Sequence, residues 1–192
     1  DVARFGGDNS ALCVRQGNTV LEIKSFASMD LMQLCGVIKN RYDDATVMER
    51  PQEILVDVIG LGAGVVDRLR EQNLPVRGIN VSESPSSRKN YLNLRAELWF
   101  AIKEWLAQRD CRLPIDDELV SELAAPLYKY TSTGKIKIES KDEMRKRGIK
   151  SPDKADALAL TMASSAASFS GSESYFGYNF KKPLKSRIIR VG

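Results

Sequence analysis

The alternation of apolar and polar positions divides the chain into short strands followed by helices. The first 26 residues hold three β-rich runs, "DVARF", "ALCVR" and "TVLEIKSF", which are separated by the turns "GGDNS" and "QGN". Short turns between such runs are typical of antiparallel strands, so we predict a three-stranded antiparallel meander. Apolar residues then recur at helical spacing over residues 29–43, which predicts the first helix.

The middle of the chain has the pattern of a parallel crossover. The run "EILVDV" (53–58) is typical of a buried strand, residues 62–72 of a helix and "LPVRGINV" (74–81) of a second strand. A strand, helix and strand of this length predict two parallel strands with a right-handed connection. Further along, we predict an amphipathic helix over 91–109, a shorter helix over 116–125, a lysine-rich β-hairpin over 127–140, and a helix over 151–166 with Ser151 as its N-cap and Pro152 at its first position.

Length and charge predict one domain followed by a basic tail. A chain of 192 residues fits one well-packed domain, which we place at residues 1–170. Residues 171–192 hold five Lys or Arg against one Glu and are predicted to be a flexible tail outside the core. That excess equals the net charge of +4, so the rest of the chain is balanced. A nucleic-acid surface must therefore be local, and residues 129–154, with nine basic and four acidic residues, form such a patch.

The residue types exclude several classes of enzyme. The chain has no histidine, which excludes Ser-His-Asp and Cys-His catalysis and the HExxH metalloproteases. Its three cysteines, Cys13, Cys35 and Cys111, are far apart, as expected of reduced thiols rather than of a zinc site. No apolar run is long enough to cross a membrane, so we expect no membrane partner. If the chain is an enzyme, carboxylates and hard cations with oxygen ligands are the expected catalytic groups.

The stretch "ILVDVIGLGAGVVDRL" (54–69) allows three interpretations. Gly60, Gly62 and Gly64 resemble a dinucleotide fingerprint, but Val65 stands where the third glycine of GxGxxG belongs. Asp57 is also compatible with a simple turn cap. In the third interpretation, Asp57 is a functional acid at the end of a buried strand, and the glycines let the chain turn sharply behind it.

Other acids favour the third interpretation. Asp1 lies on the first predicted strand, and Asp8 follows in the adjoining turn. Asp153 and Asp156 are three residues apart and share a face of the last predicted helix. A first-turn acid such as Asp153 also complements the helix dipole, but Asp156 directly precedes the apolar run "ALALTMA". Acids on these elements can meet at one point, where divalent cations would neutralise their repulsion.

Three motifs in order, "DVARFGGD", "ILVDVIGLGAGVVDRL" and "SPDKADALAL", resemble the nuclease domain of the large terminase subunit of tailed bacteriophages. The resemblance covers residues 1 to about 168. It implies an α/β, ribonuclease H-like fold, with a mixed sheet of three antiparallel and then parallel strands flanked by helices, and the basic β-hairpin as an addition. It also implies that Asp1, Asp57 and Asp156 are the catalytic, metal-binding aspartates, with Asp153 assisting at the metal site.

The resemblance further implies a reaction and a setting. We expect an endonuclease that cuts concatemeric viral DNA during genome packaging, with two Mg²⁺ or Mn²⁺ ions, in the cytoplasm of the infected bacterial host. The implied partners are double-stranded DNA, a terminase ATPase domain upstream of Asp1, the small terminase subunit and the portal. The alternatives are a nuclease like the Holliday-junction resolvases, which share this fold, and a non-catalytic DNA-binding or assembly module.

The expected DNA path crosses the predicted hairpin and the segment that follows it. Its lysines alternate along a strand, and further basic residues follow. Any one of them is most simply a solvated charge, but a cluster favours contacts with phosphates, which carry no sequence information. The predicted DNA-binding residues are Lys129, Lys135, Lys137, Arg145, Lys146, Arg147 and Lys150.

Overall fold

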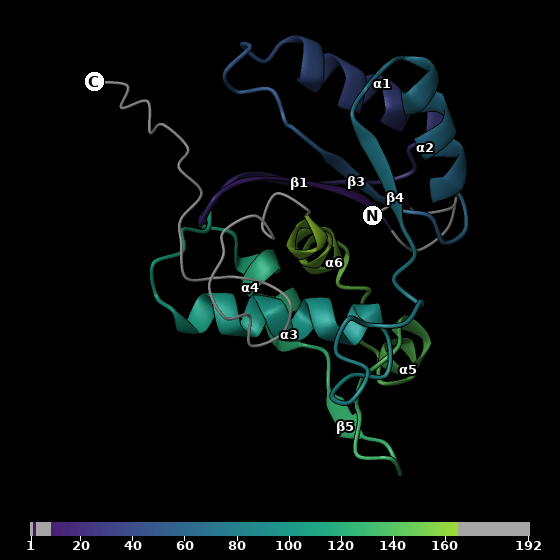
Figure 1. Ribbon diagram of the computed structural model, residues 1–192, viewed down its shortest axis with the longest axis vertical. Helices are drawn as coiled ribbons and strands as arrows, with labels where there is room; N and C mark the ends of the chain where they lie inside the picture. The colour runs from purple at the N-terminus through teal and green to yellow at the C-terminus, as the bar shows by residue number, and fades with distance from the viewer. Residues whose placement is uncertain (1, 3–8, 165–192) are drawn as a thin grey trace.

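The computed structural model describes residue 2 and residues 9–164 of the chain. Figure 1 shows a mixed α/β architecture in which helices lie on both sides of a layer of strands. The strands are β1 (Ser10–Gln16), β2 (Thr19–Phe26), β3 (Ile54–Asp57), β4 (Val76–Ile79), β5 (Tyr128–Tyr130) and β6 (Ile136–Ile138). The helices are α1 (Leu31–Asp43), α2 (Gly62–Glu71), α3 (Leu94–Ala107), α4 (Asp117–Ala124), α5 (Lys141–Lys146) and α6 (Asp153–Leu160), which continues into the 3₁₀ turn η1 (Thr161–Ala163).

The described strands form three pairs. β1 and β2 are antiparallel, β3 and β4 are parallel, and β5 and β6 are antiparallel. The sequence predicted that the first two pairs belong to one mixed sheet with a third antiparallel strand. That strand, over residues 1–5, falls outside the described residues except for Val2, so the complete mixed sheet stays a prediction.

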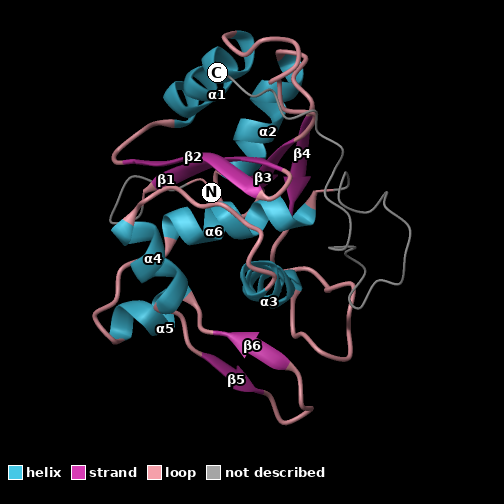
Figure 2. Cartoon of the chain, turned by 90° about the vertical axis from the view of Figure 1, so that its left-hand side faces the viewer, coloured by secondary structure: helices cyan, strands magenta, loops and turns pink. Residues whose placement is uncertain are grey.

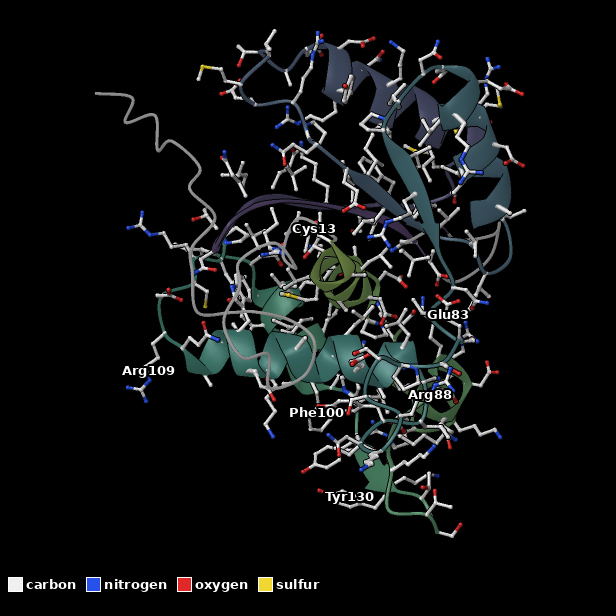
Figure 3. All side chains as sticks on the ribbon, viewed as in Figure 1. Cys13, Glu83, Arg88, Phe100, Arg109 and Tyr130 are labelled. Atoms are coloured by element: carbon white, nitrogen blue, oxygen red, sulfur yellow. The ribbon has the colours of Figure 1, made fainter. Side chains whose placement is uncertain are left out.

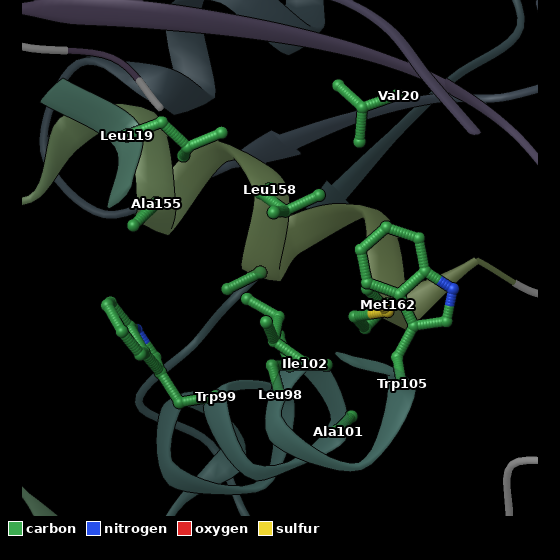
Figure 4. Close-up of a cluster of buried hydrophobic side chains, with 11 residues drawn as sticks. Val20, Leu98, Trp99, Ala101, Ile102, Trp105, Leu119, Ala155, Leu158 and Met162 are labelled. Atoms are coloured by element: carbon green, nitrogen blue, oxygen red, sulfur yellow. The ribbon is translucent and has the colours of Figure 1, made fainter. Parts of the chain in front are cut away.

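Two apolar cores lie on opposite sides of the strand layer. On one side, α1 and α2 pack against β3, with Leu34, Val56 and Leu69 almost completely buried. On the other side, α6 crosses beneath the strands and rests on α3 (Figure 2). Figure 4 shows Leu98 and Ile102 of α3 below Leu158, Trp105 beside Met162, and Trp99 below Ala155. Helix α6 is thus packed between the strands and α3.

Helix termini follow the capping rules in most places. Asp30 caps α1 and forms a reciprocal capping box with Gln33, and Asn93 caps α3 through the amide of Ala96. The prediction of Ser151 as an N-cap was wrong by one residue, because α6 begins at Asp153 with Pro152 in the cap position.

Helix α5 was not predicted. It follows β6 directly, and Ser140 and Glu143 form a capping box at its start. The predicted tail over 171–192 lies outside the described residues. Among the residues that the structure does describe, no helix combines the length and hydrophobicity needed to cross a bilayer.

Candidate active site

Asp57 is the last residue of β3, at the start of a tight turn into α2. Its carboxylate accepts a hydrogen bond from the backbone amide of Ile59, at 3.1 Å from Oδ1. The turn continues through Gly60, whose φ of 74° is in the left-handed region that favours glycine. A Cβ atom on Gly62 would lie 1.6 Å from the carbonyl oxygen of Asp57. These two glycines therefore let α2 start directly behind Asp57, which is the role that the third interpretation gave them.

Asp156 lies in the first turns of α6 and is held by groups from α3. Its Oδ1 accepts hydrogen bonds from the indole Nε1 of Trp99 at 2.8 Å and from Nη2 of Arg95 at 3.1 Å. Its Oδ2 lies 3.6 Å from the ammonium of Lys141. The side chain is only 12% exposed, so its charge is balanced mainly by these protein cations.

Asp153 lies one turn earlier on the same helix and is also buried. Its Oδ1 accepts from the hydroxyl of Ser151 at 2.5 Å and from Lys141 at 3.2 Å, and its Oδ2 accepts from the backbone amide of Asn9 at 2.9 Å. Asp153 therefore connects α6 to the segment just before β1. The interpretation of Asp153 as a helix-dipole acid is incomplete, since these contacts fix it to three other parts of the chain.

Two cations of the site were missed by the sequence reasoning. Lys141, the first residue of α5, contacts both Asp153 and Asp156. Arg95, on α3, contacts Asp156 and also donates from Nη1 to the carbonyl oxygen of Glu139, at 2.7 Å. Both residues were assigned to surface or helix patterns, and only the tertiary structure brings them to the carboxylates.

Asp57 shares the electrostatic environment of this cluster. Burial raises the pKa of the Asp57 carboxyl, and the charge of Asp156 raises this pKa further, whereas the Ile59 amide and Lys141 lower it. The charge of Asp156 therefore acts on Asp57, and Asp156 shares the ammonium of Lys141 with Asp153. Asp1 and Asp8 lie outside the described residues.

The donors in this neighbourhood suit a hard divalent cation. Carboxylate oxygens are the ligands that Mg²⁺ and Mn²⁺ prefer, and the described carboxylates already attract Lys141 and Arg95. Within residues 9–164, no three acidic or thiol side chains come together as a ready-made metal cluster. The metal site predicted from Asp1, Asp57 and Asp156 therefore stays a prediction, since Asp1 lies outside that range.

The predicted DNA-binding residues lie on and after the β5–β6 pair, and several are neutralised by neighbouring acids. Lys129 faces Lys137 across the pair, and both ammonium groups reach Glu143, at 3.3 and 3.5 Å. The backbone amide and the hydroxyl of Ser140, together with Lys129, lower the pKa of Glu143 to about 2, so this acid stays ionised.

The segment after the hairpin shows the same partial neutralisation. Arg145 pairs with Asp142 at 2.6 Å, and Arg147 pairs with Glu139 at 2.5 Å. Lys146 is exposed. Lys150 is exposed as well, and Lys135 is half-buried just before β6. The positive potential of this surface is therefore smaller than the count of basic residues suggests.

Comparison with solved structures identifies the architecture. The nuclease domain of the large terminase subunit gp2 of bacterial virus Sf6 superposes with a TM-score of 0.68 at 24% identity, over 82% of this chain and 83% of that one. A variant of the same domain with manganese and β-thujaplicinol gives a TM-score of 0.69 at 21% identity, over 82% and 83%. The chain has the fold of a terminase nuclease domain. This finding confirms the resemblance that the three sequence motifs indicated.

The fold extends to a more distant terminase. The large terminase nuclease from thermophilic phage G20c with bound magnesium superposes with a TM-score of 0.55 at 13% identity, over 81% of this chain and 82% of that one. No protein-family model and no curated protein sequence matches the chain. Identities this low explain why the terminase nuclease fold is detected by structure and by short motifs rather than by overall sequence.

Proposed function

We propose that this chain is a divalent-metal-dependent endodeoxyribonuclease that cuts viral DNA during genome packaging. The proposal is supported by the terminase nuclease fold, in which Asp57 ends β3, Asp156 lies on α6, and the charge of Asp156 adds to the effect of burial in raising the pKa of Asp57. The solved relatives include structures with manganese, calcium and magnesium, which supports the use of a divalent metal.

The residues that would hold the metal ions are Asp1, Asp57 and Asp156, with Asp153 assisting. When bound, two Mg²⁺ or Mn²⁺ ions supply activation of the attacking water and neutralisation of the leaving oxygen. The protein contributes rigid positions for these carboxylates. Asp57 is fixed by the end of a strand and the Gly60–Gly62 turn, and Asp156 is fixed by Trp99. Because the metal ions would activate the water and the carboxylates would hold the ions, the reaction needs no histidine.

The substrate proposed is double-stranded DNA lying over the β5–β6 pair and α5. The basic residues there support phosphate contacts, and Lys141 links this surface to the carboxylates. In this proposal, residues 1–170 form a ribonuclease H-like nuclease domain with a complete mixed sheet, and residues 171–192 form a basic tail. Its partners are an upstream ATPase domain, the small terminase subunit and the portal, in the cytoplasm of the infected host.

Plasmid cleavage tests the proposal. Wild-type protein with Mn²⁺ is expected to nick and linearise supercoiled DNA, and a chelator is expected to abolish the reaction. Asp156→Asn should lose cleavage, whereas Asp67→Asn, a matched change at a 75% exposed position on α2, should retain it. Cleavage that survives the chelator would refute the metal mechanism. Preferential cutting of branched DNA would favour the resolvase alternative, and tight DNA binding without cleavage would favour the non-catalytic module.

A further inference from the structure

Four aromatic side chains form a connected row beside the hairpin, and we call them the aromatic face: Tyr91, Phe100, Tyr128 and Tyr130. Tyr91 and Phe100 have ring centroids 5.6 Å apart, Phe100 and Tyr128 are 5.2 Å apart edge to face, and Tyr128 and Tyr130 are 6.2 Å apart edge to face. Figure 3 shows Phe100 below α3 and Tyr130 further along the hairpin. The row therefore runs from the buried Tyr91 outward along β5.

Successive side chains of β5 point to opposite sides of the strand, so the aromatic and the basic residues of the hairpin lie on different sides. Tyr128 and Tyr130 lie on one side of the strand, and Lys129 lies on the other, where it reaches Glu143 together with Lys137. The lysine side is thus partly neutralised by an ionised acid. The aromatic side contacts α3, where the ammonium of Lys103 lies over the rings of Phe100 and Tyr128. At the inner ring, burial raises the pKa of Tyr91, and the acids on this side, Glu104 and Glu97, raise it further.

The outer rings are unusually accessible. Tyr130 is 67% exposed and Tyr128 is 50% exposed, whereas Tyr91 at the inner end is 3% exposed. The ammonium of Lys103 lies 5.1 Å from the centroid of Phe100 and 6.0 Å from that of Tyr128. The surface therefore offers aromatic ring faces to solvent with a cation placed among them.

Exposed aromatic rings beside a lysine suit single-stranded nucleic acid better than duplex DNA or an apolar protein segment. Single-stranded nucleic acid is bound by aromatic rings that stack on bases together with cations that contact the phosphates. Bases inside a duplex are already stacked, so exposed rings gain little from them. An apolar protein segment would bury the charge of Lys103 against the rings without supplying a counter-charge, which is unfavourable.

We propose that the aromatic face binds single-stranded DNA, with a base stacked on Tyr130 and a phosphate at Lys103. The face is connected to the candidate active site, since β6 leads from Ile136 through Glu139 to Lys141. The inference goes beyond the nuclease proposal, because a strand held here needs no cleavage.

A series of substitutions at Tyr130 tests the stacking directly. The measurement is fluorescence anisotropy of a labelled oligothymidine of about 12 nucleotides, and of a duplex of equal length, in chelator at about 50 mM salt. Tyr130→Ala and Tyr130→Leu should each weaken single-strand binding by about 5-fold to 150-fold, the range for one stacked base. Tyr130→Phe should bind as wild type, because it keeps the ring. Duplex affinity should change less than about twofold under the same conditions.

Further controls separate stacking from general charge. Lys103→Ala should lower the salt dependence of single-strand binding by about 0.7 in log–log slope, the value for one phosphate contact. Ile115→Ala removes a fully exposed apolar side chain outside the aromatic face and should have no effect.

Absence of single-strand binding by the wild type would overturn the inference and leave the face to a protein partner. Equal affinity of the Leu and Phe variants would overturn it as well, and so would equal losses for single-stranded and duplex DNA. Because every measurement is made in chelator, failure of the nuclease proposal would not affect the result.

Discussion

The substitution Asp57→Asn separates a functional acid from a structural one. Burial and the charge of Asp156 raise the pKa of Asp57, so the ionised form is disfavoured in the folded state. At neutral pH this carboxylate therefore costs stability, by an amount of order 1 kcal/mol for one partly solvated like-charge neighbour. Asparagine removes the charge, and its side-chain oxygen can still accept the amide of Ile59. In chelator, Asp57→Asn is expected to melt at the wild-type temperature or about 2–4 °C higher.

Addition of Mn²⁺ should reverse the order of stability. At a metal concentration about 100-fold above its Kd, binding stabilises the wild type by about 2.7 kcal/mol, or about 5–11 °C in melting temperature. If Asp57→Asn weakens the metal about 100-fold, the same concentration only equals the Kd of the variant, and the gain falls to about 0.4 kcal/mol, or about 1 °C.

The assay is a pair of melting curves for each protein, with chelator and with Mn²⁺, read by circular dichroism. Asp67→Asn, which removes an exposed charge on α2, is the matched control and should shift with metal as the wild type does. If Asp57 were only a turn cap, Asp57→Asn would be neutral or destabilised in chelator and would gain as much from Mn²⁺ as the wild type. That result would refute the assignment of Asp57 as a metal ligand.

Three further predictions follow from the charges and the core. Burial raises the pKa of Glu122 to about 7, and the charge of Asp153 contributes to this rise. The contribution of Glu122 to stability is therefore fully present below the unfolded-state pKa of about 4.3 and is lost as the pH rises through about 7. Glu122→Gln should reduce this loss of unfolding free energy by about 1 kcal/mol after screening, measured by urea unfolding from pH 5 to 8. Leu158→Ala, in the fully buried α6 core, should cost about 2–5 kcal/mol in the same assay, and a cost under about 0.5 kcal/mol would contradict the packing of α6 on α3. Replacement of Lys129, Lys135 and Lys137 together by alanine should lower the slope of log affinity for duplex DNA against log salt concentration by about 2–3 units. An unchanged slope would mean that the DNA path lies elsewhere.

Periodic patterns were sufficient for most of the fold. The spacing over 29–43 predicted α1, and the glycine turn correctly placed the junction of β3 and α2. Helix α5 was missed because six residues are too few for a periodic pattern, although the S-x-x-E box of Ser140 and Glu143 was a usable signal. Ser151 was assigned as an N-cap because its type and position fit, but its hydroxyl donates to Asp153 instead.

The sequence indicated the carboxylates of the candidate site but not the residues that contact them. Acids at a strand end and at a helix start stand out against apolar neighbours, so Asp57 and Asp156 could be found from the sequence. Their partners could not, because the relevant property is tertiary. Trp99 fits the apolar stripe of an amphipathic helix, and nothing local indicates that its indole N–H donates to Asp156. The same limit holds away from the site, where Glu97 on α3, a 2% exposed acid, accepts hydrogen bonds from the backbone amides of Ser86 and Ser87.

The contacts around Asp156 make the hairpin and the candidate active site one mechanical unit. Arg95 contacts Asp156 with its Nη2 group and the carbonyl oxygen of Glu139, at the end of the hairpin, with its Nη1 group. Two residues later, Lys141 contacts both acids of α6. A shift of β6 therefore changes the positions of both cations at once, and the charge balance of the carboxylates changes with them. Under the proposed function, we therefore expect DNA bound at the hairpin to change the affinity of these carboxylates for divalent metal through the same covalent and ionic contacts.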